Sequence, residues 1–250
     1  MPQYSDDLRL GPVRIPNAGA DPAGAVNPSP MSTGVGPLGR VYIWDAVPLT
    51  LQAAGLATSQ NPASGAAFTL AAGTGVTVNT RPDGTLEYVL DVPRCVTLSA
   101  AGANSAQYLV SGYDQYGQPM TANLAAPSTS TVATTKAFKT VTSITNRNAT
   151  AGTNGLTAGF NDKLGLPWRL ADVGYIASVK WAGALAQDAG TAVAADATDP
   201  ATAATTDVRG CYTPSSAANG ARRLVMALAL PALACGPQAT AVGAFGVTQA

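Results

Sequence analysis

The sequence predicts an all-β protein: a β-sandwich, jelly-roll or immunoglobulin-like, with an extended Pro/Gly-rich N-terminal arm and long loops. Three observations predict this class. Short segments that alternate apolar and polar residues recur along the chain. Gly, Pro and Asn separate these segments at the spacing typical of a sandwich. Segments with the period of a helix are nearly absent, so we expect strands to build the core.

Residues 1–38 predict an extended arm. The segment "LGPVRIPNAGADPAGAVNPSPMSTGVGPLG" alternates Pro and Gly with small residues and has neither a helical nor a strand period. We expect the arm to lie along a neighbouring subunit or its own domain, with Arg14 and Ile15 as interface candidates. Residues 39–250 are predicted to form one β-sandwich domain with long insertions, and a split near 146–160 is the alternative.

The first strands are expected in "RVYIWDAVPLTLQ", "AAFTLAAGTGVTVNT" and "TLEYVLDVP". In the third, Leu86, Tyr88, Leu90 and Val92 alternate with acidic residues, which predicts one buried face. The preceding Pro-Asp-Gly predicts a hairpin turn, because proline fixes its own φ and Gly84 accepts the strained position. The segment "LATSQNPASG", residues 56–65, is expected to be a surface loop.

The later strands follow the same logic. They are expected in "RCVTLSA", "QYLVSGY", "QPMTANLAA", "KAFKTVTSITN", "VGYIASVKWAG", "TDVRGCYTP", "RRLVMALAL" and "TAVGAFGVT". In the turn "GYDQYGQ", the Asp114 carboxylate can accept local backbone N–H bonds and Gly117 supplies positive φ. Residues 188–210, rich in Ala, Thr and Asp, are expected to form a long surface loop because they carry no stable apolar stripe.

Charge is scarce in this chain. Charged residues make up 11% of the sequence, against roughly 25% in ordinary soluble domains. No charged residue lies between Asp45 and Arg81, and only Asp114 lies between Arg94 and Lys136. A surface this poor in charge is expected to be covered largely by other protein. The balance of 14 basic and 14 acidic residues argues against direct nucleic-acid binding, which needs a basic surplus on one face.

The sequence offers few residues that could serve catalysis or metal binding. The chain has no histidine, which removes the commonest general base and the usual zinc ligand. Carboxylates that could be considered for glycoside hydrolysis or calcium are Asp172, Asp188, Asp196, Asp199 and Asp207. Their spacing fits a solvated acidic loop better than a glycosidase pair or an EF-hand. We therefore predict no catalytic, cofactor-binding or metal-binding residues, and no enzyme activity.

The cysteines indicate the redox compartment of the protein, and the apolar segments indicate whether it associates with a membrane. Cys95, Cys211 and Cys235 are far apart and odd in number, which suits a reduced compartment better than a disulfide framework. The N-terminus lacks the apolar region of a secretory signal. The most apolar segment, "LVMALALPALACG", is too short to span a bilayer and contains Pro231. It is interpreted as a buried strand that runs into a turn, with no membrane partner.

The aromatic residues divide into core and interface candidates. Trp44 and Trp181 lie in expected strands and are interpreted as core residues. Trp168 follows a proline and precedes Arg169, a combination that suits an interface hot spot. With Tyr113 and Tyr116 of the turn, these residues complete the candidate interface.

Four segments resemble the β-rich structural proteins encoded beside the major capsid protein in tailed bacteriophages, especially short-tailed ones. They are "SGYDQYGQPMT", "TTKAFKTVTSI", "NDKLGLPWRLADVGYI" and "DVRGCYTPSSAANGARRLVMAL". The resemblance covers roughly the C-terminal three-fifths of the chain. Tyr113 departs from it, where a smaller residue is expected, and so does Cys211, where a hydroxyl residue is usual.

The resemblance implies a capsid cement (decoration) protein that forms a homodimer or homotrimer and binds the major capsid protein. Such a protein is assembled in the host bacterial cytoplasm, lies on the capsid exterior of the virion and stabilises the head against the pressure of packaged DNA. The alternatives are another virion component, such as a tail-tube, neck or head-completion protein, and a host-glycan-binding module.

Overall fold

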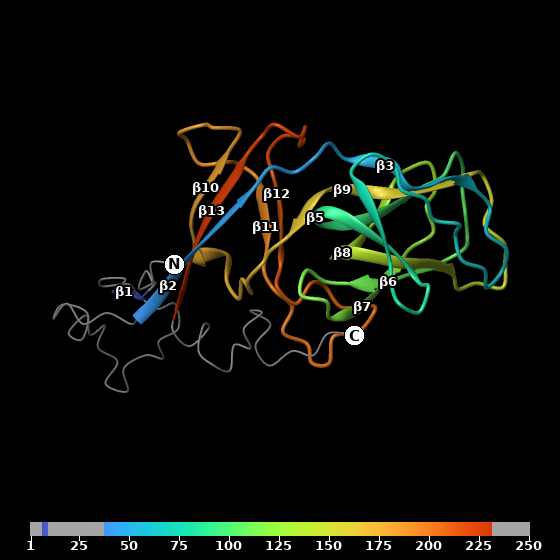
Figure 1. The fold of residues 1–250 in the computed structure, drawn as a ribbon, viewed down its shortest axis with the longest axis horizontal. Helices are drawn as coiled ribbons and strands as arrows, with labels where there is room; N and C mark the ends of the chain where they lie inside the picture. Colours follow the sequence, from blue (N-terminus) through green and yellow to red (C-terminus); the bar gives the residue numbers. More distant parts are fainter. Residues whose placement is uncertain (1–6, 10–37, 232–250) are drawn as a thin grey trace.

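The computed structural model describes residues 7–9 and 38–231, and antiparallel β-strands dominate this part of the chain (Figure 1). The strands form two curled sheets, so the prediction of an all-β, sandwich-like fold is confirmed. In Figure 1 the smaller sheet lies on the left, and β11 and β12 lie between it and the rest of the larger sheet.

The larger sheet has nine strands in the order β11-β12-β9-β5-β8-β6-β7, with β3 paired to β9 and β4 paired to β5. Their bounds are β3 (Gln52–Gln60), β4 (Val76–Thr80), β5 (Leu86–Ser99), β6 (Tyr108–Tyr113), β7 (Pro119–Leu124), β8 (Val132–Asn146), β9 (Leu156–Gly165), β11 (Thr191–Val193) and β12 (Cys211–Thr213). The smaller sheet has the order β1-β2-β13-β10. Its strands are β1 (Asp7–Arg9), β2 (Leu38–Ala46), β13 (Leu224–Pro231) and β10 (Ile176–Trp181), and the 3-10 helix η1 (Val173–Tyr175) precedes β10.

The β4–β5 hairpin forms as predicted. Gly84 has φ 84°, and its N–H donates to the Arg81 carbonyl at 2.9 Å. Tyr88 and Leu90 are buried on one face, whereas Leu86 is exposed and Val92 packs against a second apolar cluster. The alternating pattern therefore holds only in the middle of the predicted segment.

Strand β5 is longer than the sequence indicated. "TLEYVLDVP" and "RCVTLSA" form one strand that continues through Pro93. The pairing of β5 with β8 and with β9 shifts register at Arg94. Such irregularities accommodate a residue that has no N–H for the ladder, which is why a proline can lie inside a central strand here.

Strand β9 was missed by the sequence analysis, although it pairs with β5, β3 and β12. Its Gly159, Asn161 and Lys163 interrupt any alternation of apolar and polar residues. A Cβ at Gly159 would lie 1.8 Å from the Gln52 carbonyl oxygen. Glycine is therefore required where β3 crosses β9, and the residue that weakens the pattern is the one that permits the packing.

Three loop and strand assignments need correction. Residues 56–60 of the expected loop belong to β3, where Leu56 and Ala57 are buried. Residues 191–193 of the expected 188–210 loop form β11. In contrast, residues 66–75 are irregular apart from an isolated bridge between Ala67 and Thr145, so only 76–80 of that predicted strand form one. Burial of apolar side chains accounts for the first case, because Leu56 and Ala57 are buried, but not for β11, where Thr191 and Val193 are exposed.

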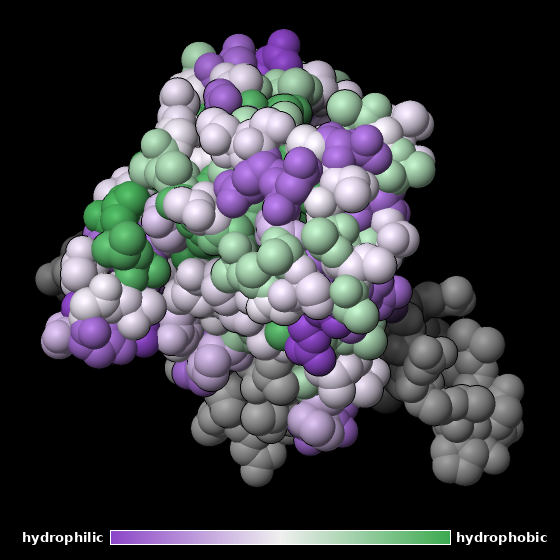
Figure 2. All heavy atoms as spheres, turned by 90° about the vertical axis from the view of Figure 1, so that its right-hand side faces the viewer, coloured by the Kyte–Doolittle hydropathy of each residue, from purple (hydrophilic) through white to green (hydrophobic). Residues whose placement is uncertain are grey.

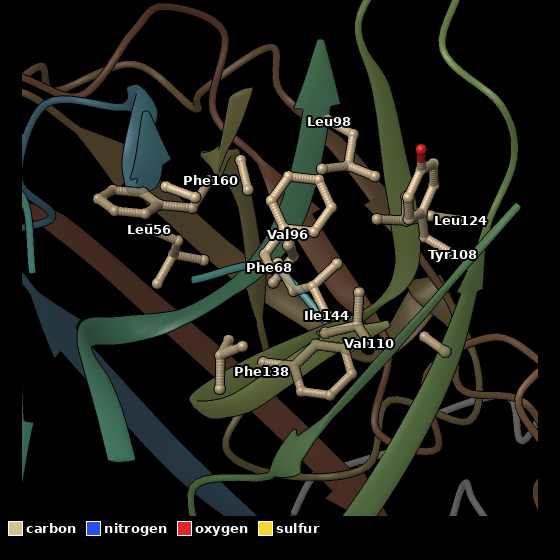
Figure 3. Packing of buried hydrophobic residues seen from close by; sticks show 14 of the residues in the cluster. Leu56, Phe68, Val96, Leu98, Tyr108, Val110, Leu124, Phe138, Ile144 and Phe160 are labelled. Carbon is tan, nitrogen blue, oxygen red and sulfur yellow. The ribbon is translucent and has the colours of Figure 1, made fainter. Parts of the chain in front are cut away.

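Two apolar clusters form the core. The first fills the curled larger sheet, and Figure 3 shows its members from β3, β5, β6, β8 and β9 converging: Leu56, Val96, Leu98, Tyr108, Val110, Phe138, Ile144 and Phe160. The second lies between the smaller sheet and the β9–β12 end of the larger one: Leu164, Leu166, Leu170, Val179, Trp181, Tyr212, Ala218, Leu224, Met226 and Leu228. Trp181 is buried and Trp44 packs against this cluster, as predicted for core residues.

The first cluster includes Leu156, Ala158 and Phe160 from within 146–160 but no residue beyond it, whereas the second includes Val92 from before this segment and Leu164 from after it. That residues 39–250 form one domain rather than two stays a prediction. The strand predicted at 240–248 lies outside the described residues, as does most of the arm, of which Asp7–Arg9 pairs with Leu38–Arg40. The described part of the chain contains no helix that is long and apolar enough to cross a membrane.

Candidate docking surface

Three of the predicted interface residues lie near Pro167, because Trp168 and Arg169 follow it in the chain and Tyr116 bonds to it. The Tyr116 hydroxyl, in the turn between β6 and β7, donates a hydrogen bond to the Pro167 carbonyl at 2.7 Å. The next residue, Trp168, stacks on Tyr42 of β2 with 4.7 Å between ring centroids and 32° between ring planes. We call Tyr42, Tyr116, Trp168 and Arg169 the docking surface. It joins both sheets through the segment that follows β9.

The remaining predicted interface residues lie elsewhere. Tyr113, at the end of β6, has the Arg81 guanidinium 4.2 Å from its ring centroid. Arg81 also bonds Glu87 across the β4–β5 hairpin, so Tyr113 belongs with that hairpin. Arg14 and Ile15 lie outside the described residues.

A buried ion pair holds the turn that carries Tyr116. Asp114 Oδ1 accepts the backbone N–H groups of Tyr116 and Gln118 at 2.8 and 2.9 Å, and Gly117 has φ 78°, so the predicted turn chemistry is confirmed. Asp114 Oδ2 lies 2.8 Å from Arg209 Nη1, with side-chain exposures of 4% and 3%. The guanidinium also lies over the Tyr116 ring at 4.9 Å. Sequence reasoning missed this partner because Arg209 is remote along the chain.

Arg209 belongs to a segment, residues 205–211, that crosses from β8 to β9. The Thr205 carbonyl accepts from Thr135 Oγ1 at 3.0 Å. Asp207 Oδ2 accepts the Ala137 N–H at 2.9 Å and its Oδ1 accepts the Arg209 N–H at 2.8 Å. Burial raises the pKa of Asp207, and these N–H bonds oppose the shift. The carboxylate thereby anchors the crossing segment to the larger sheet.

Lys136 lies beside this anchor and is fully buried. Burial lowers the pKa of Lys136, while the charges of Asp207 and Asp196 oppose that shift. The charges of these carboxylates therefore reduce the cost of burying the Lys136 ammonium group.

Three of the other candidate acidic residues, Asp172, Asp188 and Asp196, have local structural partners. Asp172 accepts the Gly174 N–H at 2.7 Å and caps η1. Asp188 accepts the Tyr212 hydroxyl at 2.6 Å, and Asp196 accepts the N–H groups of Thr198 and Thr206, each at 2.9 Å. Asp199 is exposed. Within the described ranges, no group of three or more Cys, Asp or Glu side chains is placed to hold a metal ion.

A second buried arginine joins the two clusters. Arg94 has a side-chain exposure of 0%; it donates to both Asp91 oxygens at 2.8 and 2.7 Å and to Asp162 Oδ1 at 2.9 Å. It also donates to the Leu49 carbonyl at 2.5 Å. Burial raises the pKa of Asp91, but the bonds and charge of Arg94 outweigh it, so the pKa lies below its ordinary value. No local pattern indicated this arrangement, because Asp162 and Leu49 are remote from Arg94 along the chain.

Few charged residues on the remaining surface are fully exposed. Among residues 41–229, the exposed charged residues are Asp45, Asp83, Arg147, Asp172, Asp199 and Arg223, and Asp45 and Arg223 pair with each other. Figure 2 shows one face of the molecule, where pale and green residues surround scattered purple ones. Small uncharged side chains therefore dominate what the described part of the chain presents to a partner.

No protein-family model, curated protein or solved structure matches this chain.

Proposed function

We propose that this chain is a phage capsid cement protein, which binds the major capsid protein on the outside of the shell and acts mechanically rather than as an enzyme. The observation that carries the proposal is the placement of charge. Arg94, Asp114, Lys136, Asp207 and Arg209 are all buried, so a chain that is already poor in charge places part of that charge in its interior. The rest of its surface suits contact with protein.

A surface of this kind favours large, salt-insensitive interfaces. Contact with small uncharged side chains does not require ions to be removed from water, which is the main penalty in a polar interface. Binding at many equivalent positions of a symmetric shell then converts modest single contacts into lasting attachment. The added interface energy opposes the outward pressure of packaged DNA.

The docking surface is the proposed centre of that contact. Trp, Tyr and Arg are the residues most often found at the energetic centres of interfaces. Here the Asp114–Arg209 pair and the Tyr116–Pro167 hydrogen bond hold the aromatic groups in place before binding. A rigid surface loses less side-chain entropy on association, so it binds more tightly for the same contacts.

The copy number of the protein in purified phage particles tests this proposal. Gel densitometry would compare its 25.0 kDa band with the band of the major capsid protein. A ratio close to stoichiometric supports a role across the whole shell. A ratio of a few per cent overturns it in favour of a neck or tail component, and absence from the particle favours the glycan-binding alternative.

A further inference from the structure

Two cysteines that are remote in sequence meet inside the larger sheet. Cys95 lies on β5 and Cys211 begins β12. Both are free thiols, with exposures of 0% and 1%. With Ala137 they form a small buried cluster separate from the two main ones. The two side chains are therefore neighbours in the interior, packed together beside the Ala137 methyl group.

The crossing segment brings them together. It is held on β8 at Ala137 through Asp207, and at its end Cys211 pairs with Gly165 of β9. Strand β5 lies between β8 and β9, and Cys95 is the residue that pairs with Ala137. Residues 207–211 therefore cross directly over Cys95.

Gly165 leaves the space in which this contact forms. A Cβ at Gly165 would lie 2.6 Å from the Ala137 Cβ and 3.0 Å from the Pro93 Cβ. Any larger residue would push the neighbouring strands and the crossing segment apart. The backbone on both sides of the cluster is set by strand pairing, so the two thiols are held facing each other.

We propose that Cys95 and Cys211 are a latent disulfide, which closes when the chain passes from a reducing to an oxidising environment and fastens residues 205–211 to the sheet. The change of environment rests on the proposed function: assembly occurs in a reducing cytoplasm, and the released particle meets an oxidising medium. Closing the disulfide would fix the segment that carries Arg209. Because Arg209 supports the docking surface, that surface would be fixed as well.

The reaction is a two-electron oxidation by a small-molecule disulfide such as oxidised glutathione. One thiolate attacks the glutathione disulfide and releases one glutathione thiolate. The second cysteine then attacks the mixed disulfide, forms the Cys95–Cys211 bond and releases the other. The two protons of the protein thiols pass to solvent or to the glutathione thiolates. One disulfide is thus reduced for each one formed.

The same site explains why the thiols persist during assembly. The interaction with Cys95, followed by burial, raises the pKa of the Cys211 thiol. Because the thiolate is the reacting species, the folded chain exchanges slowly near neutral pH. Oxidation therefore proceeds on transient opening of the crossing segment, and faster at alkaline pH.

The test uses the full-length chain with Cys235→Ser, so that only the proposed pair remains. The folded protein is incubated with oxidised glutathione at about pH 8.5, then unfolded in an alkylating agent and analysed by mass spectrometry. The expected result is no alkylation of either cysteine and one linked pair of tryptic peptides, 95–136 and 210–222. The thermal midpoint should rise by about 5–10 °C and return after reduction.

The matched control is Cys235→Ser with Cys211→Ser, which should keep one alkylatable thiol and show no oxidant-dependent change in its midpoint. Alkylation of both cysteines, or glutathione bound to each, after complete incubation would overturn the proposal. The measurement needs only isolated protein, so its failure is distinguishable from a failed copy-number measurement on particles.

Discussion

Arg94 Nη1 and Asp162 Oδ1 lie 2.9 Å apart at the boundary between the two apolar clusters. The second Asp162 oxygen accepts the Ala218 N–H at 3.1 Å, and Arg94 also holds the Leu49 carbonyl. This single pair therefore connects β5 and β9 to the segments that lead into β3 and β13. Because those segments adjoin the smaller sheet, the pair links the two sheets.

Replacing Arg94 by methionine should destabilise the protein by about 3–5 kcal/mol, because it leaves the Asp91 and Asp162 carboxylates without their cation. Urea unfolding followed by circular dichroism measures the change. The control is Arg223→Met, which removes an exposed pair with Asp45 and should leave the midpoint almost unchanged. Equal effects of the two variants would show that Arg94 does not hold the sheets together.

Replacing Asp114 by asparagine separates its two roles. The amide oxygen can still accept the Tyr116 and Gln118 N–H groups, but the charge opposite Arg209 is lost. We expect a loss of about 3 kcal/mol in the free energy of unfolding, since the buried guanidinium keeps its charge. Asp83→Asn is the control, because Asp83 makes the same kind of turn bond to the Thr85 N–H at 2.9 Å in an exposed hairpin. A similar small effect in both turns would contradict the prediction.

Asp196 should make the protein sensitive to acid. The backbone N–H of Thr198, its hydroxyl and the N–H of Thr206 lower the pKa of Asp196 to about 2. A lowered carboxyl pKa stabilises the fold above the unfolded value near 4, and this contribution is lost as pH falls toward 2. Because the Asp196 carboxylate is partly exposed, we expect it to contribute about 1 kcal/mol to the free energy of unfolding.

The difference in thermal midpoint between the natural chain and Asp196→Asn measures that contribution. It should be constant above about pH 5 and shrink below about pH 4. A difference that does not change across this range would assign the effect of the substitution to lost hydrogen bonds alone.

Gly159→Ala should prevent β3 from packing on β9, because the new Cβ would meet the Gln52 carbonyl oxygen at 1.8 Å. Overpacking of this kind costs about 1–3 kcal/mol or more, and here the obstacle is backbone that cannot rotate away. Urea unfolding compares it with Thr157→Ala in the same strand, where the side chain is only shortened. If the Gly159→Ala variant were as stable to urea as the natural protein, β3 would not pack on β9 as described.

Trp168→Ala should reduce incorporation into phage particles by at least about tenfold, as expected when a central interface aromatic is removed. Quantitative gels of particles grown with each variant measure the effect, after circular dichroism establishes that the variant folds. The control is Leu86→Thr, an exposed apolar residue on the β4–β5 hairpin. Normal incorporation of a folded Trp168→Ala protein would remove this surface from the proposal.

The sequence by itself determined the fold class and the turns. Alternation around Tyr88 and Leu90, the Pro-Asp-Gly turn at Gly84, and the Asp114 turn with Gly117 are all confirmed. Each depends on a few adjacent residues, because side-chain alternation and turn chemistry are local properties of the backbone. For the same reason the scarcity of charge could be read directly from composition.

Only the tertiary structure decided how these elements combine. Strand β9 is central although Gly159 and Asn161 interrupt its pattern, and the Arg94–Asp162, Arg209–Asp114 and Cys95–Cys211 contacts join residues remote in the chain. Strand register and buried pairing depend on which surfaces meet, and no local window of sequence contains both partners. The docking surface has the same origin, because Tyr116 reaches Pro167 only when the larger sheet curls.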